Sequence, residues 1–173
     1  MRPRRIEPGP GQESVWDYPR PPRIEPVDRQ LEVCARTPAG SLVVIAATDR
    51  GLRVLETSQA PAYYFPPEDV DTSLLEPSRT ATYCEWKGVA AYVDLVLVDD
   101  TGARTVADVA WTYPSPNPGF ADIAGWYAFY AARVDRCRVG EDEVIPNDGD
   151  FYGGWITPDV VGPFKGGPGS QGW

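Results

Sequence analysis

Short segments rich in β-branched and aromatic residues recur along this chain, and residues typical of turns separate them. RTPAGS at residues 36–41 and DDTG at residues 99–102 are two of these turn signals. The pattern predicts a mainly β domain, in which an antiparallel sheet bends around a core as a sandwich or open barrel with one or two short helices. About seven strands are expected, over residues 31–35, 41–48, 62–67, 80–86, 89–99, 105–113 and 126–139.

Two segments favour short helices. Residues 49–58, DRGLRVLETS, predict a helix or turn with Arg53 and Glu56 three positions apart on one face. Pro67 is suited to open a second short helix over residues 68–75.

The second half of the chain contains the longest expected strand. Residues 31–48 predict a hairpin, and residues 120–125 predict a single helical turn. Residues 126–139, WYAFYAARVDRCRV, place aromatic side chains on both faces of an extended chain, which predicts a long strand in the centre of its sheet. The glycine-rich residues 151–173 are expected to be irregular.

Proline, glycine and charge divide the chain into four parts. Residues 1–13 predict a disordered Pro/Arg-rich tail. Residues 14–30 contain too many prolines for a helix but include large apolar side chains, which predicts an extended arm packed on the domain. Residues 31–169 predict a single β-rich domain, and residues 170–173 a C-terminal tail.

The chain has a formal net charge of -9 at pH 7. Because an acidic surface repels phosphate backbones, we expect no nucleic-acid partner. No apolar run approaches the roughly 20 residues of a membrane span, and the arginine-rich start lacks the apolar part of a secretory signal. A soluble cytoplasmic protein without a membrane partner is expected, and a homo-oligomer remains an open alternative.

The chain contains no histidine, which excludes Ser-His-Asp and Cys-His catalysis. Acid–base chemistry would therefore depend on a carboxylate, lysine, tyrosine or cysteine. Cys34, Cys84 and Cys137 form no CxxC pair, so reduced, buried thiols are expected. A mixed Cys/Asp metal site is the alternative, and we expect neither a metal nor a cofactor.

Lys87 and Lys165 are the two lysines among 16 basic residues, and glycine follows each. Glycine leaves room beside the ammonium group, and lysine offers a point charge on a flexible stem. We predict that Lys87 is catalytic and that Lys165 binds the ligand. The alternative is that both neutralise nearby acidic residues.

The chain has 6 tryptophans, 9 tyrosines and 5 phenylalanines, more than a small core needs, which favours an aromatic pocket. Tyr63 and Tyr64 point to opposite faces of their strand, so one of them can line a groove. Core packing is the alternative for each aromatic residue, and a structural Arg53–Glu56 pair is the alternative for those two. The site hypothesis is a pocket with catalytic Lys87 and Glu56, and with ligand-binding Arg53, Tyr63, Tyr64, Tyr92, Trp111, Tyr113 and Lys165.

Two classes of function follow. In the first, the protein is a cofactor-independent enzyme of secondary metabolism that isomerises, cyclises or moves a proton on a small molecule. In the second, it is a non-catalytic protein-interaction or scaffolding domain.

Eight short sequence motifs, in this order along the chain, resemble those of the family catalogued as domain of unknown function 427. They are VWDYPRPP, RVLETS, YYFPPEDV, CEWKGVAAY, AWTYPSP, AFYAARVD, FYGGWIT and GPFKG, spread from Ser14 to Gly169. The resemblance implies a compact β-rich domain related to tent-like β-folds, some of which bind zinc. The family is sometimes labelled nucleotidyltransferase-like.

The sequence differs from the family pattern at two positions. Gln59 stands where a histidine is usual, and Glu85 where a proline is usual. Family chemistry that used the histidine is therefore not expected here. The chain also lacks the GxxxxGK[ST] phosphate cradle, and VDLVLVDDTG reads as strand plus turn.

Overall fold

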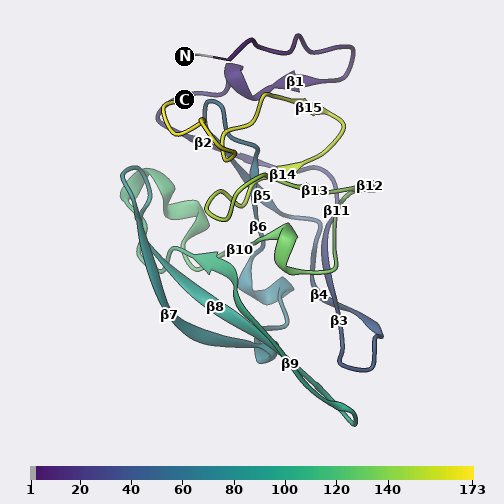
Figure 1. The fold of residues 1–173 in the computed structure, drawn as a ribbon. Helices are drawn as coiled ribbons and strands as arrows, with labels where there is room; N and C mark the ends of the chain where they lie inside the picture. Colours follow the sequence, from purple (N-terminus) through teal and green to yellow (C-terminus); the bar gives the residue numbers. More distant parts are fainter. Residues whose placement is uncertain (1–2) are drawn as a thin grey trace.

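The computed structural model describes residues 3–173 and shows a mainly β protein whose sheets curl around a common core (Figure 1). The predicted mainly β, antiparallel class is confirmed. Helical structure among the described residues consists of short 3-10 segments: η1 (Val15–Asp17), η2 (Pro67–Asp69), η3 (Thr72–Leu74), η4 (Pro118–Ile123) and η5 (Ala131–Arg133).

The longest strands form a four-stranded antiparallel sheet in the order β10-β9-β8-β7. Its strands are β7 (Leu75–Cys84), β8 (Gly88–Asp99), β9 (Gly102–Thr112) and β10 (Tyr127–Phe129). Side chains on both faces of β8 are buried. Leu95 and Leu97 enter the main core, whereas Ala90 and Tyr92 face a second apolar cluster.

This sheet bends sharply part-way along its strands (Figure 1). The register shifts at one level in both the β7–β8 and the β8–β9 pairing. At that level Asp108 has a φ of 50°, and its N–H donates to the Asp94 carboxylate at 2.8 Å. Because bulges increase twist and bend the strand, this irregularity gives the sheet its curl.

Two smaller sheets complete the core. One has the order β12-β11-β3-β4 and the other β2-β5-β6. Phe65, just after β6, exchanges two backbone hydrogen bonds with Tyr127 of β10 at 2.8 and 2.9 Å, which joins the second sheet to the large one. The strands are β3 (Leu31–Arg36), β4 (Leu42–Thr48), β11 (Arg136–Val139), β12 (Asp142–Glu143), β2 (Arg23–Pro26), β5 (Leu52–Leu55) and β6 (Ala62–Tyr64).

The N-terminal segment and the C-terminal loop lie side by side at the top of Figure 1. Strand β1 (Glu13–Ser14) pairs in parallel with β15 (Val160–Val161), and β13 (Ile145–Pro146) pairs with β14 (Trp155–Ile156). The Ile6 N–H also donates to a backbone carbonyl, that of Gly162, at 3.2 Å. Mobility of residues 3–13 stays a prediction, and residues 1–2 of the predicted tail lie outside the described residues.

The core has one large apolar cluster and two satellites. Trp155, Phe65 and Phe129 are fully buried at the centre of the large cluster, with the rings of Phe65 and Phe129 edge to face at 5.6 Å. Val15 of the arm is fully buried against Leu55 in a satellite. The arm therefore contributes to the core.

The helix predicted over residues 49–58 is wrong, because residues Leu52–Leu55 form strand β5. This strand pairs with β2 on one side and β6 on the other. Ladders on both edges satisfy the backbone polar groups of β5 and bury Val54 and Leu55, which outweighs the weak helical preference of the segment. Arg53 and Glu56 therefore share no helix face.

The single long central strand predicted over residues 126–139 is also wrong. The chain leaves the sheet after β10, turns through η5, and enters a different sheet as β11. Arg133 stabilises this turn, because its guanidinium stacks on the Tyr130 ring at 3.9 Å and donates to the Asp108 carbonyl at 2.6 Å.

Other local predictions are confirmed. Residues 31–48 form the β3–β4 hairpin, and Pro67 is the first residue of η2. The segment over residues 68–75 is two 3-10 turns in place of a continuous helix. Within residues 3–173, no helix has both the length and the apolar character needed to span a bilayer.

Candidate functional site: an aromatic cavity with two lysines

A cavity of about 220 Å³ lies between the large sheet, the β7–β8 turn and the C-terminal loop. We call it the aromatic cavity. Segments far apart in the sequence line it, including residues 59–60, 82–87 and 151–154. Seven residues of the predicted site are among its lining: Glu56, Tyr64, Lys87, Tyr92, Trp111, Tyr113 and Lys165.

Aromatic rings from neighbouring strands form its wall. Tyr92 of β8 and Trp111 of β9 stand directly opposite each other in register. The Tyr130 ring lies 4.7 Å from the ring of Trp111 and stacks on Tyr92 at 6.5 Å. From β6, the Tyr64 hydroxyl accepts a hydrogen bond from Trp111 Nε1 at 3.1 Å. These contacts hold the rings in fixed orientations, so the wall is preformed.

Three tyrosine hydroxyls at the cavity are held neutral by burial. Burial raises the pKa of Tyr64, Tyr113 and Tyr130 above the usual phenol value. The Tyr130 hydroxyl donates to the Phe151 carbonyl at 3.2 Å, whereas the Tyr113 hydroxyl has no hydrogen-bond partner among residues 3–173. Tyr113 is therefore available as a neutral donor to a bound molecule.

Lys87 lies in the β7–β8 turn, where a neighbouring loop fixes the backbone. Asn117 donates from its N–H to the Lys87 carbonyl at 3.0 Å and from its side chain to the Trp86 carbonyl at 2.8 Å. Gly88 follows with a φ of 102°, a conformation that favours glycine. The Lys87 Nζ lies 5.6 Å from the centre of the Tyr113 ring, within cation–π range.

Lys165 reaches the same cavity from the C-terminal loop. Its N–H donates to the Ser58 carbonyl at 2.7 Å, and its carbonyl accepts from the Asn147 side chain at 2.7 Å. Its Nζ lies 5.4 Å from the centre of the Tyr152 ring and donates to a main-chain oxygen of Trp173 at 3.2 Å.

Neither ammonium group lies within 4.0 Å of an aspartate or glutamate side chain among residues 3–173. Across residues 3–173, every ion pair within 4.0 Å uses an arginine, and none uses Lys87 or Lys165. Neutralisation of a neighbouring acid by direct contact therefore does not explain why these positions carry lysine.

Glu56 follows β5 and has a charged partner from the arm. The Arg20 Nε lies 3.4 Å from its carboxylate, and the Glu56 side chain is 14% exposed. Arg20 also donates to the Thr57 carbonyl at 3.0 Å and to a main-chain oxygen of Trp173 at 3.2 Å. Arg20 of the arm, which also contacts the C-terminal loop, thus fixes the position of the Glu56 carboxylate at the cavity.

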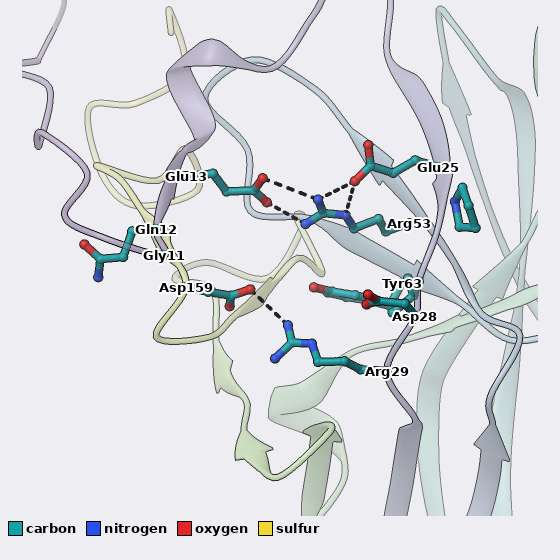
Figure 2. Close-up of a pocket in the computed structure, with 11 residues that line it drawn as sticks. Gly11, Gln12, Glu13, Glu25, Asp28, Arg29, Arg53, Tyr63 and Asp159 are labelled. Atoms are coloured by element: carbon teal, nitrogen blue, oxygen red, sulfur yellow. Dashed lines mark hydrogen bonds and ion pairs between the residues drawn. The ribbon is translucent and has the colours of Figure 1, made fainter.

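Arg53 and Tyr63 lie elsewhere, in a polar cavity of about 460 Å³ under the N-terminal segment (Figure 2). We call it the polar basin. Arg53 forms ion pairs with Glu13 and with Glu25, and Arg29 pairs with Asp159 at 2.9 Å. Alternation along β5 and β6 explains the separation, because Arg53 and Tyr63 point away from the face that carries Tyr64. The prediction that these two residues share a pocket with Lys87 is not supported by their placement.

In the polar basin, ion pairs connect segments that lie far apart in the sequence. Both guanidinium groups point into it, each toward a carboxylate from another part of the chain (Figure 2). Tyr63 is 2% exposed, and burial raises the pKa of its hydroxyl. Because the arginine charges are already matched, the aromatic cavity is the stronger candidate for a ligand.

A family model described as Domain of unknown function (DUF427) matches residues 23–140, more than half of the chain. The chain belongs to the DUF427 family. The match contains the strands that carry Tyr64, Tyr92 and Trp111, whereas Lys165 lies beyond it. No curated protein matches the chain.

Gln59 and Glu85, where this DUF427 chain differs from the residues that the resemblance implies, both line the aromatic cavity. Within residues 3–173 no group of three or more histidine, cysteine, aspartate or glutamate side chains is arranged to hold a metal ion. Cys34 and Cys137 are buried free thiols, and Cys84 is a partly buried free thiol that lines the aromatic cavity.

Several lining residues of this DUF427 domain were missed by sequence reasoning. Tyr130 was predicted to lie in a central strand. Trp86 and Tyr152 were noted only as members of the motifs that resemble the family, and no role in a cavity was predicted for them. The FYGGW motif at residues 151–155 could have indicated the cavity wall, since adjacent glycines between large aromatic residues indicate close packing. A Cβ atom at Gly153 would lie 2.4 Å from the Trp111 ring.

Proposed function

We propose that this DUF427 domain binds a small organic molecule in the aromatic cavity. The observation that carries the proposal is Lys87, whose ammonium group has no carboxylate within 4.0 Å among residues 3–173 and lies against the Tyr113 ring. A partly buried charge without a partner is costly, and a ligand with a complementary group would supply one. Concave sites with aromatic walls and a few convergent polar groups are typical of small-molecule binding.

The volume of the cavity limits the size of the ligand. A cavity of roughly 150 Å³ accommodates benzene, so about 220 Å³ suits one substituted ring. A nucleoside triphosphate is far larger than this. The size of the cavity therefore disfavours a nucleotide as its ligand.

A catalytic role would fall to Lys87 and Glu56. Both line the cavity, and a proton transfer, isomerisation or cyclisation needs groups that give and take a proton beside the bound molecule. Arg20 already engages the Glu56 carboxylate. We therefore assign Lys87 the more direct contact with the ligand.

A surface beside the cavity favours protein interaction as the second candidate. Tyr83 and Val89 face each other across β7 and β8, and they are 71% and 57% exposed. Large exposed apolar side chains that form a patch mark interaction sites. If a protein partner docks here, Val89→Ser weakens its binding while small-molecule binding stays unchanged, because Val89 does not line the cavity.

The test of small-molecule binding is a substitution that fills the cavity. Ala62 lines the aromatic cavity, whereas Ala103 is exposed at the far end of β9. We expect benzoate, benzamide or phenol to change the tryptophan fluorescence of the native protein, because Trp86 and Trp111 line the site. Ala62→Phe should abolish that change, and Ala103→Phe should preserve it.

Circular dichroism checks that both variants are folded, and Ala62→Leu provides a milder filling substitution. Equal responses from Ala62→Phe and Ala103→Phe would show that the compounds bind elsewhere and would overturn the proposal. The proposal would also be overturned by amide shifts in NMR spectra that gather around Val89 while Trp111 and Tyr113 stay unchanged.

A further inference from the structure

We infer that the ligand of the aromatic cavity is a single-ring aromatic acid whose carboxylate is held by Lys87, with Lys165 adding a second positive charge to the lining. This inference rests on the proposed function and adds the charge and the shape of the molecule. Neither lysine forms an ion pair with an acidic side chain among residues 3–173, although the chain has 25 acidic residues against 16 basic ones. In a chain with this excess of acid, two ammonium groups at one cavity without an acidic side chain beside them favour an anionic ligand.

The carboxylates at the cavity leave Lys87 free. The lining contains two carboxylates, Glu56 and Glu85. Glu56 faces the Arg20 guanidinium at 3.4 Å, and Glu85 is exposed at the rim. The unengaged charge inside the site is therefore the Lys87 ammonium group, since Lys165 already donates to a Trp173 oxygen at 3.2 Å.

Hydrogen-bond donors add to this preference. The Tyr113 hydroxyl lines the cavity without a partner among residues 3–173, and burial keeps it protonated. A neutral phenol beside an ammonium group offers a carboxylate two donors from different directions. An amide or an amine ligand would use these donors less well, since neither places a full negative charge on its acceptor.

The walls argue for a ring. Trp111 and Tyr130 lie 4.7 Å apart as a tilted pair, and Tyr92 stacks on Tyr130. Flat, preformed aromatic surfaces favour a planar ligand that stacks or meets them edge to face. A cavity of about 220 Å³ leaves room for one such ring with its carboxylate.

The test compares benzoate with its neutral isostere benzamide and with the cation benzylamine, by calorimetry and tryptophan fluorescence. We expect benzoate to bind at least about tenfold more tightly than benzamide, with benzylamine the weakest, because a charge-assisted hydrogen bond is roughly twice as strong as a neutral one. Added salt should lower the affinity for benzoate and leave the affinity for benzamide nearly unchanged.

Variants then assign the charge. Lys87→Met should remove most of the preference for benzoate while the affinity for benzamide stays within about twofold. Lys165→Met should remove a smaller part of that preference, because its ammonium group already donates to a Trp173 oxygen. The matched control is Arg79→Met, which removes one positive charge from an exposed position of β7 outside the cavity. This control should keep the benzoate affinity within about twofold of the native value.

The outcomes separate this inference from the proposed function. If benzamide binds as tightly as benzoate and Ala62→Phe blocks both, the cavity binds small molecules but the anionic class is wrong. If benzoate is preferred but Arg79→Met weakens it as much as Lys87→Met, the lysines do not hold the carboxylate. If none of the three compounds binds at millimolar concentration, the inference is overturned, and the proposed function then depends on other ligands.

Discussion

Gly153 has no side chain, and the Trp111 ring occupies the space beside it. A Cβ atom at this position would lie 2.4 Å from two carbons of that ring and 3.1 Å from the Tyr130 ring. The position of Trp111 in the wall of the aromatic cavity therefore depends on glycine at residue 153. Only a residue without a side chain allows the loop to approach the indole ring so closely.

Gly153→Ala should therefore destabilise the protein by about 1–3 kcal/mol, since the added methyl group overpacks a preformed contact. Urea unfolding measures this change. Gly119→Ala is the matched control, because a Cβ there has no heavy atom within 4 Å, and its effect should stay within roughly 0.5 kcal/mol. Equal midpoints for the two variants would mean that Trp111 moves aside readily and is not a fixed wall.

At the scale of elements, a single carboxylate joins two turns. Asp99 ends β8 and accepts hydrogen bonds from the N–H and hydroxyl of Thr101 at 2.8 and 2.6 Å, and from the Ala39 N–H at 2.8 Å. The β8–β9 turn is thereby tied to the β3–β4 turn. These donors, led by the Thr101 hydroxyl, lower the pKa of Asp99 from 3.8 to about 2.

A depressed pKa in the folded protein makes the stabilisation by Asp99 depend on pH. The contribution is complete above the ordinary pKa of 3.8 and is lost as the pH falls from about 4 to about 2. Thermal melting should show a native advantage over Asp99→Asn at pH 6 that shrinks toward zero near pH 2. Asp100→Asn is the control, because the Asp100 side chain is exposed and makes no hydrogen bond with residues 3–173, and a similar shrinkage there would contradict the assignment.

At the scale of the whole molecule, Arg53 connects the N-terminal arm to the body of the domain. It lies on β5, and its guanidinium pairs with Glu13 of β1 and Glu25 of β2 (Figure 2). The Arg53 side chain is 16% exposed. Removing a largely buried charge between two carboxylates leaves both acids facing each other without compensation.

Arg53→Met should lower the free energy of unfolding by about 1–3 kcal/mol, less than for a fully buried pair because both glutamates are partly exposed. Arg23→Met is the comparison, since that exposed arginine contacts Glu25 at 3.4 Å and should cost under about 1 kcal/mol. Denaturant titration of both variants measures the difference. Similar losses would mean that the arm is held by its apolar contacts alone.

Local sequence patterns were informative where neighbouring residues decide the structure. The β3–β4 hairpin, the turn at DDTG and the start of η2 at Pro67 depend on turn residues and alternation over a few positions. The patterns failed over residues 49–58 and 126–139. There, strand pairing on both edges of β5, and the contacts of Arg133 with Tyr130 and Asp108, come from distant parts of the chain.

The candidate site divides in the same way. The residue types of Lys87, Tyr64 and Trp111 mark them as candidates without any structure, and alternation places Tyr63 and Tyr64 on opposite faces. The separation of Arg53 from Glu56 could not be anticipated from a helical spacing, because the segment is a strand whose partners lie in the arm.

The sequence by itself determined the β-rich class of this protein, its turns, its acidic character and the lack of histidine chemistry, since these depend on composition and short-range preference. Tertiary structure decided that Glu56, Lys87 and Lys165 line one cavity and that Arg53 and Tyr63 line another. The physical reason is that a cavity forms where non-local strand pairing, a bulged bend and a glycine contact bring remote segments together. Local residue preferences carry no information on which remote segments come into contact.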